Sequence, residues 1–239
     1  MRRQLFYIPF SLTFLLLLIL ILIFGLGFLF FGVIISAFMK IGFSTGDALL
    51  ILVLSLVGSS INIPVATLKS EIPVVRDNYV RVFGVSYRVP IRRMTRNETT
   101  IAVNVGGAII PVLISAYLLI KFPSSLLLAG AGVLIVTLIT YSIARPIRGL
   151  GIATPALVPP LTAALAAILL TSVFQIPDCP IDQCRVVTAY VGGVLGTLIG
   201  ADLLNLRKIR NLGAPIASIG GAGTFDGIFL SGFIALLLI

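Results

Sequence analysis

Long apolar runs recur along this chain, and they constrain its fold more than any other feature. The first extends from about residue 8 to residue 38, and six more follow, separated by short segments that carry charges, Gly and Pro. A transmembrane helix needs about 20 largely apolar residues. We therefore predict one all-α polytopic transmembrane bundle over residues 1–239. Its seven predicted spans are 8–38, 47–66, 100–120, 124–143, 153–174, 186–206 and 220–239.

Composition supports this prediction and removes several kinds of chemistry. Only 10% of the residues are charged and the mean hydropathy is +1.18, whereas soluble domains carry about 25% charged residues. The chain has no His and two Cys, which excludes Ser-His-Asp and Cys-His catalysis, His-based metal sites and a zinc cluster. No metal and no cofactor is expected. Carboxylates remain as the strong proton-transfer groups.

The distribution of positive charge predicts an orientation. Lys and Arg concentrate in cytoplasmic loops, and here 14 lie on one side of the predicted spans and three on the other. The first side holds Arg2, Arg3, Lys69, Arg76, Arg81, Arg88, Arg92, Arg93, Arg96, Arg145, Arg148, Arg207, Lys208 and Arg210, and the second holds Lys40, Lys121 and Arg185. We predict that the N-terminus is cytoplasmic and the C-terminus external. Because the charges are spread between spans, nucleic acid is not an expected partner.

The longest polar insert, residues 69–99, follows the second predicted span. Its β-branched and aromatic pieces are separated by turn signals at 76–78 and Gly84, a pattern typical of a small β-hairpin or meander. The basic residues at 69–96 are explained by topology, and contact with anionic lipid headgroups is a possible addition. The bilayer itself is the expected partner.

Two cysteines, Cys179 and Cys184, fall in one predicted external loop. Oxidising conditions outside the cytoplasm permit a disulfide that closes this loop. Two free thiols are the alternative, and the disulfide is the favoured prediction.

Two acids, Asp202 and Asp226, are predicted at membrane depth, where ionisable groups are costly and usually functional. Asp202 precedes Arg207 by five residues, which places it about 7 Å inside the cytoplasmic edge. Thirteen residues follow Asp226, which places it about 10 Å from the same edge. Two such carboxylates would share a proton, one acting as a base and the other as an acid. Local alternatives are a hydrogen bond to backbone for Asp202 and a helix cap for Asp226.

Other polar and helix-breaking residues gather on the same predicted side. Irregular backbone at membrane depth is tolerated where it is buried in protein or lines a watery cavity. We expect a cavity open to the cytoplasm, with the two acids at its floor and with Asn62, Asn104, Thr154, Pro155, Gly221 and Gly223 around it. The ridge Gly192, Gly196 and Gly200 predicts a close helix contact on the opposite face from Asp202.

The segment Gly221 to Phe229 resembles the Gly-x-Gly-Asp motif of the presenilin and signal-peptide-peptidase class of intramembrane proteases. Asp202 and Asp226 match the two aspartates of that class, and Pro155-Ala-Leu157 matches its Pro-Ala-Leu element. The resemblance implies a catalytic role for both acids. The pattern departs in three ways: two residues separate Gly223 from Asp226, the Pro-Ala-Leu element precedes the acids, and seven spans are predicted rather than nine.

The whole chain is more similar to a family of prokaryotic multi-span proteins known as a domain of unknown function. This likeness rests on residues 62–64, 104–107, 153–155, 200–202 and 220–229. It implies a multi-pass protein of a prokaryotic plasma membrane and brings no activity with it.

Three functions remain open. The first is a diaspartyl intramembrane protease, with a membrane protein as substrate. The second is a secondary transporter or ion-coupled carrier for a small solute, because broken helices also line carrier sites. The third is a non-catalytic membrane scaffold. The identity of any substrate is left open.

Overall fold

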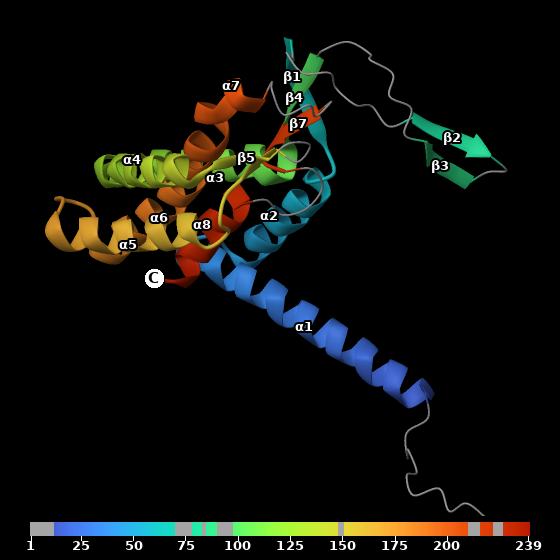
Figure 1. The fold of residues 1–239 in the computed structure, drawn as a ribbon. Helices are drawn as coiled ribbons and strands as arrows, with labels where there is room; N and C mark the ends of the chain where they lie inside the picture. The colour runs from blue at the N-terminus through green and yellow to red at the C-terminus, as the bar shows by residue number, and fades with distance from the viewer. Residues whose placement is uncertain are drawn as a thin grey trace, which may run out of the picture.

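The computed structural model describes residues 12–69, 78–82, 85–89, 98–147, 151–209, 216–221 and 227–239. Most of them are helical (Figure 1). The α-helices are α1 (Leu12–Lys40), α2 (Thr45–Gly58), α3 (Ile110–Lys121), α4 (Leu126–Ile143), α5 (Val158–Val173), α6 (Ile181–Thr197), α7 (Leu206–Ile209) and α8 (Gly227–Leu237). Two π-helical turns, η1 (Val105–Ile109) and η3 (Leu198–Asp202), and two 3₁₀ turns, η2 (Pro123–Ser125) and η4 (Leu203–Asn205), adjoin them.

Helix α6 lies at the centre of the bundle and packs against α3, α4, α5 and α8. The predicted glycine ridge forms its contact with α4: a Cβ on Gly196 would lie 2.5 Å from the Cβ of Val136. On another face of α6, a Cβ on Gly193 would lie 2.9 Å from the carbonyl oxygen of Ser231 in α8. Because glycine has no side chain, the axes of α6 and of its neighbours α4 and α8 approach closely at these positions.

The bundle has two different ends. One end, here called the sheet end, holds the strands that precede α3, α5 and α8 and the strand that follows α2. The other, the disulfide end, holds the α1–α2 turn, the end of α3 and the α5–α6 loop. Lys40 donates from Nζ to the carbonyl oxygens of Leu236 (3.0 Å) and Ile239 (2.6 Å), which brings the end of α8 to this same end. Helices α6 and α8 are therefore antiparallel.

A three-stranded sheet in the order β1-β4-β7 covers the sheet end. Strand β1 (Asn62–Lys69) pairs with β4 (Glu98–Asn104) antiparallel, and β4 pairs with β7 (Ile216–Ile219) in parallel. The two parallel strands both lead towards helices, α3 and α8. Two separate antiparallel pairs are formed by β2 (Asn78–Val82) with β3 (Val85–Val89) and by β5 (Arg145–Ile147) with β6 (Gly151–Ala153).

Several predicted helix boundaries are wrong. Residues 62–66 and 100–104, assigned to the second and third spans, are strands, because their β-branched apolar residues pair with each other across the sheet. The sixth helix begins at Ile181, inside the predicted loop, and continues through η3 and η4 to Ile209. The strand β7 and the β5–β6 pair were not predicted. The predicted hairpin in the 69–99 insert is present as β2–β3, whereas the predicted strand 72–75 lies outside the described residues.

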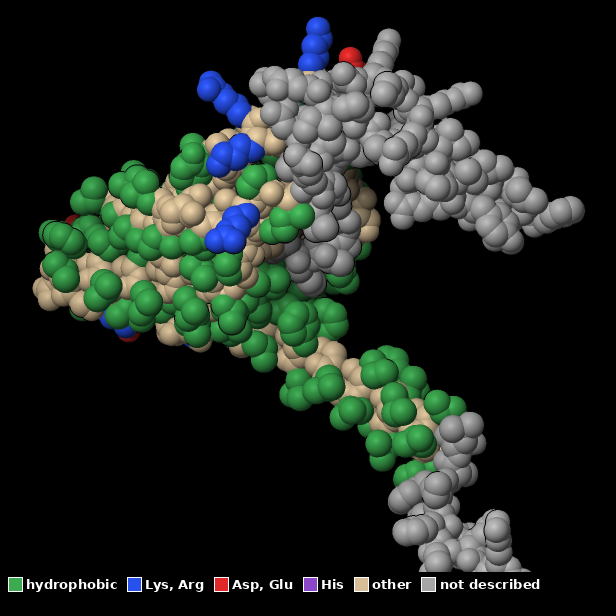
Figure 2. Space-filling model, in the orientation of Figure 1, with side chains coloured by type: hydrophobic (Ala, Val, Ile, Leu, Met, Phe, Trp, Pro, Cys, Tyr) green, Lys and Arg blue, Asp and Glu red, His purple; other side chains and the backbone are tan. Residues whose placement is uncertain are grey.

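Three helical stretches in the described part of the chain are long and apolar enough to cross a membrane: Phe14–Lys40, Pro123–Ile143 and Ile181–Ile209. Four further apolar helices, Thr45–Gly58, Val105–Lys121, Val158–Val173 and Gly227–Leu237, are shorter. Helix α1 projects from the bundle (Figure 1), and its most apolar window has no buried residue. Apolar side chains cover α1 and the visible flank of the bundle, and Lys and Arg gather near α7 and the sheet (Figure 2).

Candidate functional site

A buried asparagine organises the sheet end. Asn104, fully buried at the end of β4, donates from Nδ2 to the carbonyl of Ser59 (2.6 Å) and to Oδ1 of Asn62 (3.1 Å). Its Oδ1 accepts the N–H of Gly107 (2.7 Å) and so caps the π-turn η1. Ser218 of β7 donates its hydroxyl to Asn62 Oδ1. These four residues, Ser59, Asn62, Asn104 and Ser218, are called the asparagine cluster; they join β1, β4, β7 and the end of α2.

Close backbone contacts surround the asparagine cluster. A Cβ on Gly106 would lie 1.9 Å from the Ser55 carbonyl oxygen, and a Cβ on Gly107 would lie 1.9 Å from that of Gly220. Gly220 and Gly221 adopt positive φ angles of 83° and 87°, which favour glycine. The chain that leaves β7 towards α8 therefore lies directly against η1, and only glycine permits this approach.

The second π-turn, η3, ends at Asp202, which is half-buried. Asn205, fully buried, donates from Nδ2 to the carbonyl oxygens of Gly200 (3.0 Å) and Ala201 (2.9 Å). At such a change of helical winding, carbonyls lose their regular i+4 amide partner, and the Asn205 amide supplies donors to two of them. Each of the two π-turns is thus held by the side chain of one buried asparagine.

The Pro-Ala-Leu element lies near η3. Strand β6, which leads into Thr154 and Pro155, contacts η3, and α5, which follows, packs against both α6 and α8. Thr154 is half-buried and Pro155 is exposed. The three segments that carry Pro155, Asp202 and the start of α8 are therefore neighbours at the sheet end.

The structure brings some of the predicted site residues together. Asn62 and Asn104 are hydrogen-bonded, and Gly221 adjoins the Gly220–Gly107 contact. Asp202, Thr154 and Pro155 lie at the same end, around η3. Asp226 and Gly223 lie outside the described residues, so the predicted pairing of the two acids stays a prediction. In the described ranges, no three His, Cys, Asp or Glu side chains come together as metal ligands.

Three contributors to this site were not predicted: the hydroxyl of Ser218, the Ser59 carbonyl as an acceptor, and Asn205. The strand register that brings Ser218 to Asn62 joins segments more than 100 residues apart and has no local signal. For Asn205 a signal exists, because a polar amide inside an otherwise apolar helix needs a partner.

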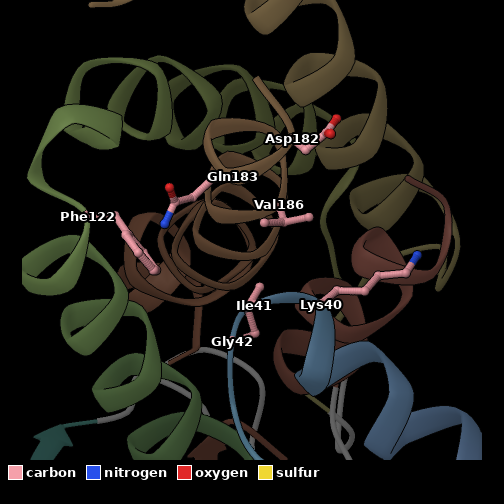
Figure 3. Close-up of a pocket in the computed structure, with 7 residues that line it drawn as sticks. All are labelled: Lys40, Ile41, Gly42, Phe122, Asp182, Gln183 and Val186. Atoms are coloured by element: carbon pink, nitrogen blue, oxygen red, sulfur yellow. The ribbon is translucent and has the colours of Figure 1, made fainter. Parts of the chain in front are cut away.

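The disulfide end contains the predicted disulfide and a separate cavity. Cys179 and Cys184 are bonded, with their Cα atoms 5.8 Å apart. A cavity of about 390 Å³ lies between the α1–α2 turn and the start of α6, lined by Lys40, Ile41, Gly42, Phe122, Asp182, Gln183 and Val186 (Figure 3). Lys40 and Asp182 point away from its centre (Figure 3), and Asp202 is not one of its described lining residues.

These features define the class of the protein: apolar helices of membrane-spanning character surround a polar, glycine-rich site at one end of the bundle. Residues 56–238 match the family described as "Protein of unknown function (DUF1614)". Since this match covers more than half of the chain, the chain belongs to that family. No curated protein and no solved structure matches the chain.

Proposed function

We propose that the protein is a diaspartyl intramembrane protease whose site lies at the sheet end, between α6 and α8. The carrying observation is the buried hydrogen bond from Thr197 Oγ1 to Ser231 Oγ (2.9 Å), which fixes α6 and α8 side by side. Asp202 follows Thr197 by five residues and Asp226 precedes Ser231 by five. On antiparallel neighbours, we propose that both acids lie at a similar depth, about 7 Å towards the sheet end from this bond.

Matched depth makes a shared proton physically reasonable. One carboxylate activates water while the other, protonated, polarises the scissile carbonyl, and neither His, Cys nor metal is required. The packing of α5 against α6 and α8 supports the proposal, because it sets the Pro155 segment beside them. In this proposal the sheet end faces the cytoplasm of a prokaryotic cell, with the N-terminus inside and the C-terminus outside.

The basic side chains support that orientation. Lys69, Arg145, Arg207 and Lys208 lie on elements of the sheet end, whereas Lys40, Lys121 and Arg185 lie at the disulfide end. Six of the ten remaining basic residues belong to the 69–96 insert. We extend the proposal to anionic headgroups as partners of that insert.

Interrupted helices favour a second candidate, an ion-coupled carrier. Helix α2 ends at Gly58 and continues as a strand, and α3 begins from a strand through a π-turn capped by Asn104. Carriers bind substrates and ions at such breaks. In a carrier, one acid suffices for coupling, and the second is dispensable.

The test is cleavage of a single-span reporter by the purified protein in liposomes. Asp202→Asn and Asp226→Asn should each lower cleavage by at least about 100-fold, because each removes one half of the acid–base pair. Asp182→Asn is the matched control: its side chain is 98% exposed at the disulfide end, and its cleavage should equal that of the unchanged protein. Full cleavage by either of the first two variants would overturn the protease proposal. Uptake driven by a proton or sodium gradient that needs only one of the acids would establish the carrier.

A further inference from the structure

We propose that the π-turn η3, held by Asn205, is the device that aims Asp202 at α8, and that Asn205 is a positioning residue of the site. The inference rests on the proposed function for its catalytic meaning. The direction in which Asp202 points follows from the winding of α6 and η3 and does not depend on that function.

The first step is the direction in which α6 faces α8. Thr197 marks this direction, because its hydroxyl is hydrogen-bonded to Ser231 of α8. In a regular α-helix each residue advances about 100°, so a residue five positions later would point about 140° away from Thr197. A regular helix would therefore turn Asp202 away from α8.

The second step is the effect of η3. A π-turn accommodates one extra residue, so its five residues advance about as far as four residues of an α-helix. Asp202 is the fifth residue after Thr197 and closes this turn. Its direction then differs from that of Thr197 by only about 40°. The π-turn thus moves Asp202 by about 100°, to the side of α6 that faces the start of α8.

The third step is what keeps the turn in place. The N–H of Leu203 is shared between the carbonyls of Ile199 and Leu198, and the next turn tightens to 3₁₀ winding. The Asn205 amide donates to the carbonyls of Gly200 and Ala201, inside the π-turn. Asn205 is fully buried, so removal of its amide leaves the carbonyls of Gly200 and Ala201 without a side-chain donor in an apolar environment. The turn then relaxes towards regular winding and Asp202 rotates away.

The contact with α4 explains why η3 needs such support. Gly200 packs against α4, where a Cβ would lie 2.6 Å from the Thr137 carbonyl oxygen. This contact fixes the backbone of the turn on one side, and Asn205 fixes it from the next turn. Asp202 lies between these two attachments.

The test uses the full chain in liposomes and two readouts. Asp202→Cys and Gly227→Cys are combined, since a side chain at Gly227, the first residue of α8, meets open space. The native cysteines are bonded to each other, so a short bis-maleimide reports the introduced pair. We expect efficient cross-linking with Asn205 present and a several-fold loss with Asn205→Ala or with Ile199 deleted, which restores regular winding. Leu204→Ala, an exposed neighbour, is the control and should not change the yield.

Cleavage of the reporter gives the second readout, in chains that keep both acids. With Asn205→Ala, kcat should fall by about 10- to 100-fold while KM stays within a small factor, because misplacement of a reacting group affects the chemical step. Asn205→Gln keeps the amide donors and should recover part of this loss. A protein with a merely structural Asn205 would lose folded yield and leave kcat per folded molecule unchanged.

The outcomes separate the two proposals. If neither Asn205→Ala nor the deletion alters cross-linking or kcat, the aiming role is overturned. If both alter cross-linking and Asp202→Asn still cleaves the reporter fully, the aiming of Asp202 stands and the protease proposal falls.

Discussion

The two ends of the bundle terminate their helices in different ways. At the disulfide end, two devices are local: Ser44 and Asp47 form a capping box at the start of α2, and Cys179 and Cys184 bridge five positions. At the sheet end, helices end in strands and π-turns, and the amide of Asn104 donates to Ser59 and Asn62, which lie more than 40 residues away in the chain.

This difference is one reason why we propose the functional site at the sheet end. A local cap pairs the free backbone groups of a helix terminus with the side chains of a few neighbouring residues. Irregular backbone persists where the surrounding structure holds it, and π-turns are frequent at functional sites. The sheet end has both features, together with Asp202, whereas the disulfide end has the simpler construction of a structural anchor.

The largest effect that would sharpen this comparison comes from Gly107→Ala. Its Cβ would overlap the Gly220 carbonyl oxygen, so the contact between η1 and the chain entering α8 must open. We expect a loss of about 3 kcal/mol or more in the free energy of unfolding. Reversible unfolding in mild detergent measures it. Gly130→Ala, on α4 where nothing lies within 4 Å, is the control and should be neutral or stabilising by up to about 1 kcal/mol. Equal stability of the two variants would contradict the close contact.

A smaller loss in the free energy of unfolding is expected for Asn104→Ala. The change leaves the N–H of Gly107 and the carbonyl of Ser59 without this partner in the buried cluster, at a cost of about 2–3 kcal/mol. Asn62→Ala should lower the free energy of unfolding by a smaller amount than Asn104→Ala, since Asn62 is exposed. Thermal unfolding of both variants checks the order, and a larger loss for the exposed asparagine would break the account of the cluster.

At the disulfide end, replacing both Cys179 and Cys184 by Ser should lower the free energy of unfolding by at most about 2 kcal/mol, as expected for so short a loop. Cleavage of the reporter by the folded fraction should not change. A loss of specific activity in that fraction would show that the two ends are coupled.

The smallest effect concerns Lys40, whose ammonium group binds the last carbonyls of α8. Lys40→Gln removes a cation from a helix C-terminus and should cost about 0.5 kcal/mol. Addition of salt should narrow this difference, because the interaction is exposed to solvent. Chemical denaturation at low and high salt measures both quantities, with Lys40→Arg as the matched control.

The sequence allowed prediction of what depends on local composition. The apolar segments, the disulfide and the contact of Gly192, Gly196 and Gly200 with a neighbouring helix follow from hydropathy, topology and spacing. Strands β1 and β4 were placed in part inside the second and third predicted spans, because the apolar residues at 63–66 and 101–103 extend the apolar pattern of the neighbouring helices. The parallel pairing with β7 joins segments more than 100 residues apart, and the π-turns depend on tertiary contacts at Gly107 and Gly200. For the same reason, Asn104 and Asn62 were both predicted as site residues but the hydrogen bond between them was not.

The central claim is that the sheet end brings Asp202 and Asp226 together. The most direct measurement is oxidation of the Asp202→Cys/Asp226→Cys double variant, since a disulfide requires Cα atoms within about 7 Å. We predict rapid formation of an intramolecular disulfide that is absent from either single variant. If both introduced thiols react with a small maleimide but never with each other, the two acids do not meet, and the paired site is refuted.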